Sequence, residues 1–147
     1  MKKNEIKVVI EALKRIKMPK IEDKELRNVI IKNHLVLLGA YKQYESDIED
    51  LRIAHLGNYE DELKKFQELQ SSLQIETDRE KIKSLVEEIN SHKDLREAID
   101  GFNKAVNDLG NETVDKITAI PADKFVEEYG KQDYDMGVVE AIFPLFE

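Results

Sequence analysis

The stretch that decides the fold is residues 23–56, DKELRNVIIKNHLVLLGAYKQYESDIEDLRIAHL. Within it, apolar and amphipathic residues recur in alternating steps of four and three, which is the a/d spacing of a helix that packs lengthwise against other helices. We call the eight residues at these positions the seam: Ile30, His34, Leu37, Tyr41, Tyr44, Ile48, Leu51 and His55. The seam is expected to be an interaction surface, either within one chain or between copies.

The two ends of this helix are marked by residues that favour helix termini. Asp23 is expected to cap the first turn, and Gly57-Asn58 is expected to end the helix in a left-handed conformation. At 1.5 Å per residue, a helix over residues 23–56 is about 50 Å long. This exceeds the core diameter of a small globule, so part of the helix should stand out or be covered by a returning segment.

The returning segment is also helical in its pattern. After residue 59 the helical period continues, with a capping box that begins at Thr77 and a further restart at residues 91–94. Short connections between helices make neighbours antiparallel. We therefore expect a mainly α protein in which residues 23–109 form a long antiparallel helical hairpin or a three-helix bundle. Gly39 and Gly101, inside helices, indicate either a closely crossing helix or a kink.

The two ends of the chain complete a single domain, residues 1–147. Residues 1–22 are expected to form a basic helix and loop, with Asn4 as the helix cap and Pro19 after its end. Residues 110–147 form a small C-terminal element in which residues 112–120 are a short strand or an extended segment, followed by a helix from Pro121 to Gly130. The chain ends in an apolar tail that either fills its own core or docks on another subunit. The candidate docking residues are Ile142, Phe143, Leu145 and Phe146.

Charge and composition exclude several classes of protein. The net charge of −8 disfavours direct binding to nucleic acid. Zero cysteines exclude disulfides and thiolate chemistry. No apolar run approaches the roughly 20 residues of a membrane span. Residues 1–24 carry eight basic and four acidic side chains, so this end is either a solvated basic surface or a dock for an acidic one, such as residues 112–147 of another copy.

No group of residues predicts catalysis, a cofactor or a metal. His34 and His55 lie about 30 Å apart along one helix and cannot share an ion, and His92 is expected on the surface beside a helix cap. Residues 133–137, DYDMG, have too few acidic ligands for a calcium loop. Phosphate-binding loops and nucleophile elbows are absent from the sequence. We expect no enzyme activity and no cofactor.

The layout of the chain carries a resemblance. The chain has a short opening helix at residues 4–16, then a long charged coil, then the strings FNKAVNDL at 102–109 and ETV at 112–114 before an apolar end, FPLFE, at 143–147. This layout resembles small, mostly helical proteins of unknown function encoded in bacteriophage genomes. The resemblance implies an accessory or assembly role and names no active residues.

We therefore expect a non-enzymatic helical interaction protein that acts through helix packing and self-association. Its expected partners are proteins, chiefly further copies of itself, with no membrane and no nucleic acid. Its expected location is the host cytoplasm or the virion. The alternative is an acidic inhibitor or decoy that blocks a basic, nucleic-acid-binding site on a host protein.

Overall fold

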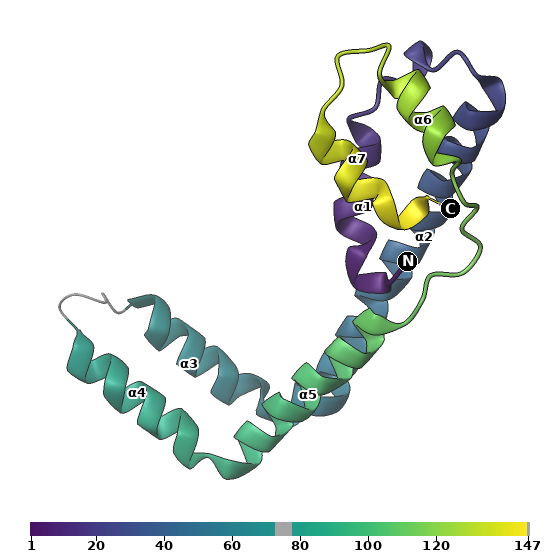
Figure 1. Ribbon diagram of the computed structural model, residues 1–147. Coiled ribbons are helices and arrows are strands. Elements are labelled where there is room, and N and C mark those ends of the chain that lie inside the picture. Colours follow the sequence, from purple (N-terminus) through teal and green to yellow (C-terminus); the bar gives the residue numbers. More distant parts are fainter. Residues whose placement is uncertain (73–77, 147) are drawn as a thin grey trace. The chain divides into compact units, whose positions relative to one another are not determined.

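A computed structural model describes residues 1–72 and 78–146 of the chain. These residues contain seven α-helices (Figure 1): α1 Ile6–Lys14, α2 Lys24–Leu56, α3 Glu60–Ser72, α4 Arg79–Ser91, α5 Lys93–Asn111, α6 Ala122–Tyr129 and α7 Met136–Ile142. The mainly α prediction is confirmed. The chain divides into two compact units. The terminal unit is Met1–Ser46 with Leu109–Glu147, and the middle unit is Asp47–Asp108, so the division falls inside α2 and α5.

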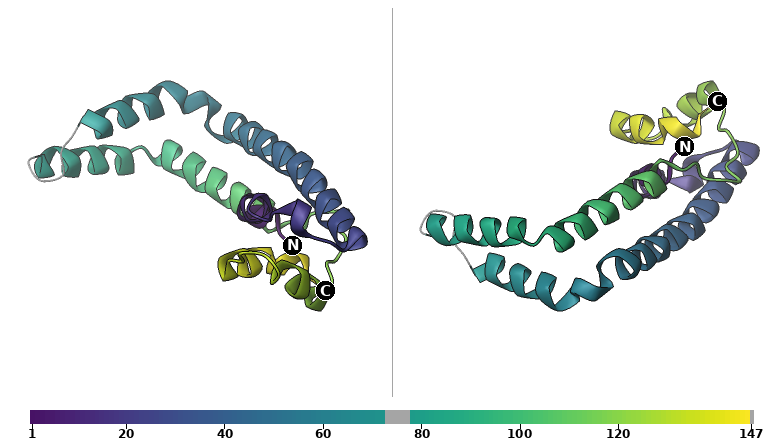
Figure 2. Two further views of the ribbon diagram at one scale, coloured as in Figure 1. Left: turned by 90° about the horizontal axis from the view of Figure 1, so that it is seen from above. Right: turned by 90° about the horizontal axis from the view of Figure 1, so that it is seen from below.

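The terminal unit is built around one apolar core. In α1 the buried residues follow the helical spacing of an amphipathic helix, which places them on one face. Figures 1 and 2 show α1 between α7 and the first part of α2. The core joins residues from all of these helices and from α6: Ile6, Val9, Ile10, Ala12, Leu13, Ile16, Ile21, Leu26, Ile30, Leu37, Ile120, Phe125, Tyr129, Val138, Ile142 and Leu145.

Three buried polar side chains tie loops to this core. Asn33 donates to the carbonyl oxygen of Thr118 over 2.7 Å and accepts from its N–H over 2.9 Å. Gln132 makes the same two-way contact with the backbone of Lys17. The Glu128 carboxylate accepts from the backbone N–H of Glu22 over 2.9 Å. These side chains give the loop backbone hydrogen-bond partners that strand pairing would otherwise supply.

Of the two alternatives predicted for residues 112–120, a short strand or an extended segment, the short strand is wrong. The segment is extended, but its only ladder contacts among the described residues are isolated bridges, from Thr113 to Lys2 and from Ile120 to Phe146. Asn33 holds the backbone between these two bridges. A side-chain amide thus supplies the partners that a neighbouring strand would have supplied.

The ends of the helices confirm some predictions and correct others. Asp23 caps α2, since its Oδ1 accepts from the N–H of Leu26 over 2.9 Å. The expected left-handed stop at Gly57 is wrong: among the described residues no glycine has a positive φ, and Gly57–Tyr59 form a 3₁₀ turn that leads into α3. The Asn4 cap is also wrong, because Lys3–Glu5 form a 3₁₀ turn before α1.

The middle unit has a much smaller core. Its α3 and α4 lie side by side (Figure 1). Of the residues described in this unit, Phe66, Leu85 and Leu95 are buried together between these helices and α5. The restart predicted at residues 91–94 is confirmed, because α4 ends at Ser91 and α5 begins at Lys93. Thr77, the first residue of the predicted capping box, lies outside the described residues.

Of Gly39 and Gly101, Gly101 makes a close approach and Gly39 does not. A Cβ on Gly101 in α5 would lie 3.3 Å from Nδ1 of His55 in α2. A side chain there would require the His55 ring to shift by a few tenths of an ångström. Gly39 in α2 faces open space, with nothing within 4 Å of a Cβ placed on it.

Candidate interaction surfaces

The predicted seam is used partly within the chain. Ile30 and Leu37 are fully buried in the core of the terminal unit, and Tyr41 packs against that core. The remaining seam residues are half-buried: His34, Tyr44, Ile48, Leu51 and His55. The first half of the seam is therefore occupied by α1 and the C-terminal helices of the same chain, and it is not available to a second copy.

The histidines stand apart from one another. The Nε2 atom of His34 is buried and has no hydrogen-bond partner among the described residues. Burial, together with the nearby charge of Lys14, lowers the pKa of His34. His92 is exposed and makes an edge contact with the ring of Phe66. Within the described residues, no group of three or more histidine or carboxylate side chains is placed to hold a metal ion.

The DYDMG string has a structural explanation. Asp135 is the N-cap of α7, where its Oδ1 accepts from the N–H of Gly137 over 2.7 Å. Its other carboxylate oxygen pairs with Arg15 at the end of α1. One oxygen therefore caps α7, and the other holds the start of α7 against the end of α1.

The side of α2 that points away from the core carries an exposed apolar stripe. Ile31, Leu35 and Leu38 are 43%, 64% and 42% exposed, in contrast to the buried Leu37 beside them. Positions 3, 4, 7 and 11 residues from Leu35 share its side of the helix. This set, all of it exposed, is the outward α2 face: Lys24, Asn28, Ile31, Lys32, Leu35, Leu38, Gly39, Lys42 and Ser46. Three lysines and no acidic residue lie on it, although the chain as a whole is acidic.

The apolar tail divides between core and surface. Ile142 and Leu145 are buried, and Phe146 packs with a ring-centroid distance of 5.5 Å to Phe125. The Leu145 carbonyl also accepts from the N–H of Ile120. Phe143, however, is 71% exposed. The tail thus fills its own core with three of its four candidate residues.

Phe143 belongs to a second exposed surface. With Met136, which is 57% exposed, and the exposed Glu140, it forms a helical side at spacings of four and three residues. We call these three residues the α7 face. Asp133, three residues before Met136, is exposed at its edge. This face combines two large apolar side chains with negative charge.

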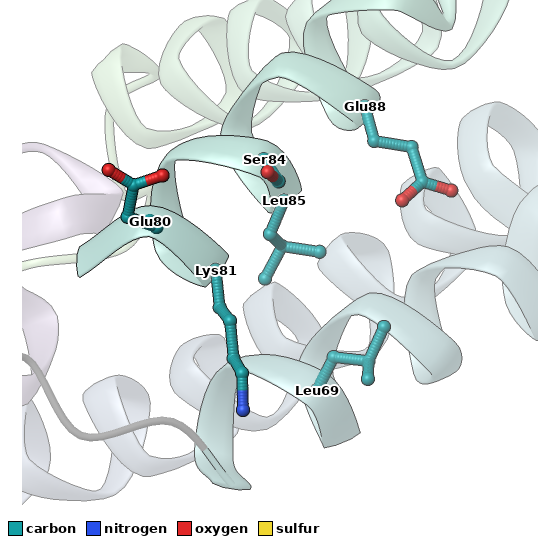
Figure 3. Close-up of a pocket in the computed structure, with 6 residues that line it drawn as sticks. All are labelled: Leu69, Glu80, Lys81, Ser84, Leu85 and Glu88. Atoms are coloured by element: carbon teal, nitrogen blue, oxygen red, sulfur yellow. The ribbon is translucent and has the colours of Figure 1, made fainter. Parts of the chain in front are cut away.

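The middle unit has a groove between α3 and α4 (Figure 3). Its volume is about 350 Å³, and Figure 3 shows Leu69 of α3 opposite Leu85 and Lys81 of α4. The full lining is Leu69, Glu80, Lys81, Ser84, Leu85 and Glu88. A second groove, of about 370 Å³, is lined in part by Phe66 and Leu95. Because two helices alone enclose little volume, the small core of this unit lies open at both grooves.

Comparison with known proteins finds no family model, no curated protein and no solved structure that matches the chain. Of the helices in the described residues, none is long and apolar enough to cross a membrane. The features available for a functional argument are therefore the exposed apolar surfaces, chiefly the outward α2 face and the α7 face.

Proposed function

We propose that this protein is a non-enzymatic helical interaction protein that acts by self-association through helix packing. The observation that carries the proposal is the stripe of Ile31, Leu35 and Leu38, three large apolar side chains exposed on one side of a 33-residue helix. Isolated exposed apolar residues are ordinary, but a continuous row at helical spacing is typical of a surface that another helix covers.

The area involved indicates a weak association. Three partly exposed side chains and the lysine stems around them supply less than the roughly 800 Å² per partner of a standard interface. We therefore expect a dissociation constant in the micromolar range or higher. Association then requires a high local concentration of the protein. Concentration-dependent assembly of this kind suits an accessory or structural component.

The test is the molar mass of the protein as its concentration rises, measured by sedimentation equilibrium. The wild type should gain mass up to about 1 mM, while Leu35→Asp, which places a charge on the exposed stripe, should remain a folded monomer. Circular dichroism checks that the variant keeps its helices. A wild-type protein that stays monomeric over this range would contradict the proposal.

We place this association in a phage accessory or assembly role on the basis of the layout resemblance. The alternative role, an acidic decoy for a basic nucleic-acid-binding site, draws on the net charge of −8. The two roles differ in their surface: a decoy would bind through acidic residues, whereas the outward α2 face is basic. Leu35→Asp separates them, because it disrupts assembly through α2 and leaves an acidic surface unchanged.

A further inference from the structure

The charges on the outward α2 face indicate what covers it. Lys24, Lys32 and Lys42 surround the apolar stripe, with no acidic residue at the same helical positions. In a parallel pair these lysines would lie against each other. In an antiparallel pair centred on Leu35, each lysine would lie about one helical turn from a lysine of the other copy. Like charges at an interface cost free energy, so pairing of the face with itself is disfavoured. The partner surface should be apolar with negative charge around it.

A surface of that description lies on the same unit. The α7 face presents Met136 and Phe143 with Glu140 between them, and Asp133 lies at its edge. It belongs to a region, residues 112–147, that contains nine acidic residues and three lysines. The spacing of Met136, Glu140 and Phe143, four and then three residues, equals that of Ile31, Leu35 and Leu38.

The two faces cannot meet within one chain. Figures 1 and 2 show α1 between α7 and α2, and the inward side of α2 contributes Leu26, Ile30 and Leu37 to the shared core. The outward α2 face therefore points away from α7. A contact between the two faces requires a second copy.

We infer that the outward α2 face of one copy binds the α7 face of another copy. This inference rests on the self-association proposed above and specifies both of its surfaces. The contact is heterologous, since it joins two different surfaces and leaves one of each free at the ends of a pair. Further copies can then add, so that the mass grows beyond a dimer. The attraction between lysines and carboxylates makes the association weaker at high salt.

A mixing experiment tests this pairing. Leu35→Asp removes the α2 face and keeps the α7 face, and Phe143→Asp does the reverse. Each variant alone should associate about tenfold or more weakly than the wild type, because each loses the apolar centre of one face. An equimolar mixture of the two should form a dimer and stop there, because only one functional pair of faces remains. Val86→Asp, at an exposed apolar residue of α4, is the matched control and should assemble like the wild type.

The possible failures can be told apart. If the wild type gains mass but the mixture of the two variants stays monomeric, the pairing is wrong and the self-association proposed above stands. If the wild type never gains mass, the proposed function and the pairing both fail. Binding of the wild type to vesicles of anionic phospholipid without any protein assembly would also overturn the pairing, because the lysines would then serve a lipid surface.

Discussion

The terminal unit and the middle unit use the same kind of helix for different purposes. In the terminal unit sixteen apolar residues are buried together, and Asn33, Glu128 and Gln132 fix the loops to that core. Among the described residues of the middle unit, three are buried together, none of these buried polar residues occurs, and grooves border the core. Since buried apolar area is the main source of stability, most of the folding free energy should reside in the terminal unit. That unit is also the one with the two proposed interaction faces.

The largest expected effect compares one aromatic residue from each core. Phe125→Ala in the terminal unit should lower the free energy of unfolding by about 3–5 kcal/mol, because its ring is fully buried among large neighbours. Phe66→Ala in the middle unit should cost clearly less, since Phe66 borders a groove into which its neighbours can relax. Urea unfolding followed by circular dichroism gives both values. Equal losses would mean that the two cores are equally well packed.

A smaller effect is expected from the two hydrogen bonds between Asn33 and Thr118. Asn33→Ala removes two part-buried hydrogen bonds to the backbone of Thr118, which together should cost about 1–3 kcal/mol. Asn28→Ala, at an exposed position five residues earlier on α2, is the control and should change stability by less than about 0.5 kcal/mol. A loss at Asn33 no larger than at Asn28 would show that the extended segment is held by other contacts.

The smallest expected effect is on the way the melting temperature depends on pH. Lys131 and the backbone N–H groups of Glu22 and Asp23 lower the pKa of Glu128. A carboxylate with a lowered pKa in the folded state stabilises the fold above its unfolded pKa of about 4.3, and this contribution is lost as the pH falls through the folded value. Glu128→Gln should therefore flatten the acid-side loss in melting temperature, and Glu127→Gln, exposed on the same helix, should leave it unchanged. Identical acid profiles for wild type and Glu128→Gln would show that this carboxylate does not couple α6 to the start of α2.

The sequence predicted the helices, but it did not predict which of their sides pack against the rest of the chain. The period of residues 23–56 and the cap at Asp23 predicted α2 closely, because spacing and capping are local properties. The sequence left residues 112–120 open between a strand and an extended segment, because a main partner of this segment, Asn33, lies 85 residues from Thr118 in the chain. Local pattern carries no information about such a pairing.

The interaction surfaces show the same limit. The predicted seam contains Ile30 and Leu37, which the chain itself buries. It does not contain Ile31, Leu35 and Leu38, although these residues have the same helical spacing. Which of two apolar sides of a helix faces the core depends on where α1 and α7 pack. For a similar reason, the four tail residues were predicted to act together. Only the fold distinguishes the exposed Phe143 from its buried neighbours.

The central claim is that the outward α2 face, and not the buried seam beside it, is where copies of the protein meet. The most direct test records leucine methyl NMR signals of the wild type over a dilution series. We expect the methyl signals of Leu35 and Leu38 to shift with concentration, while those of the buried Leu37 and of Leu85 in the middle unit stay constant. Signals of Leu35 and Leu38 that remain constant from dilute to concentrated protein would contradict the account.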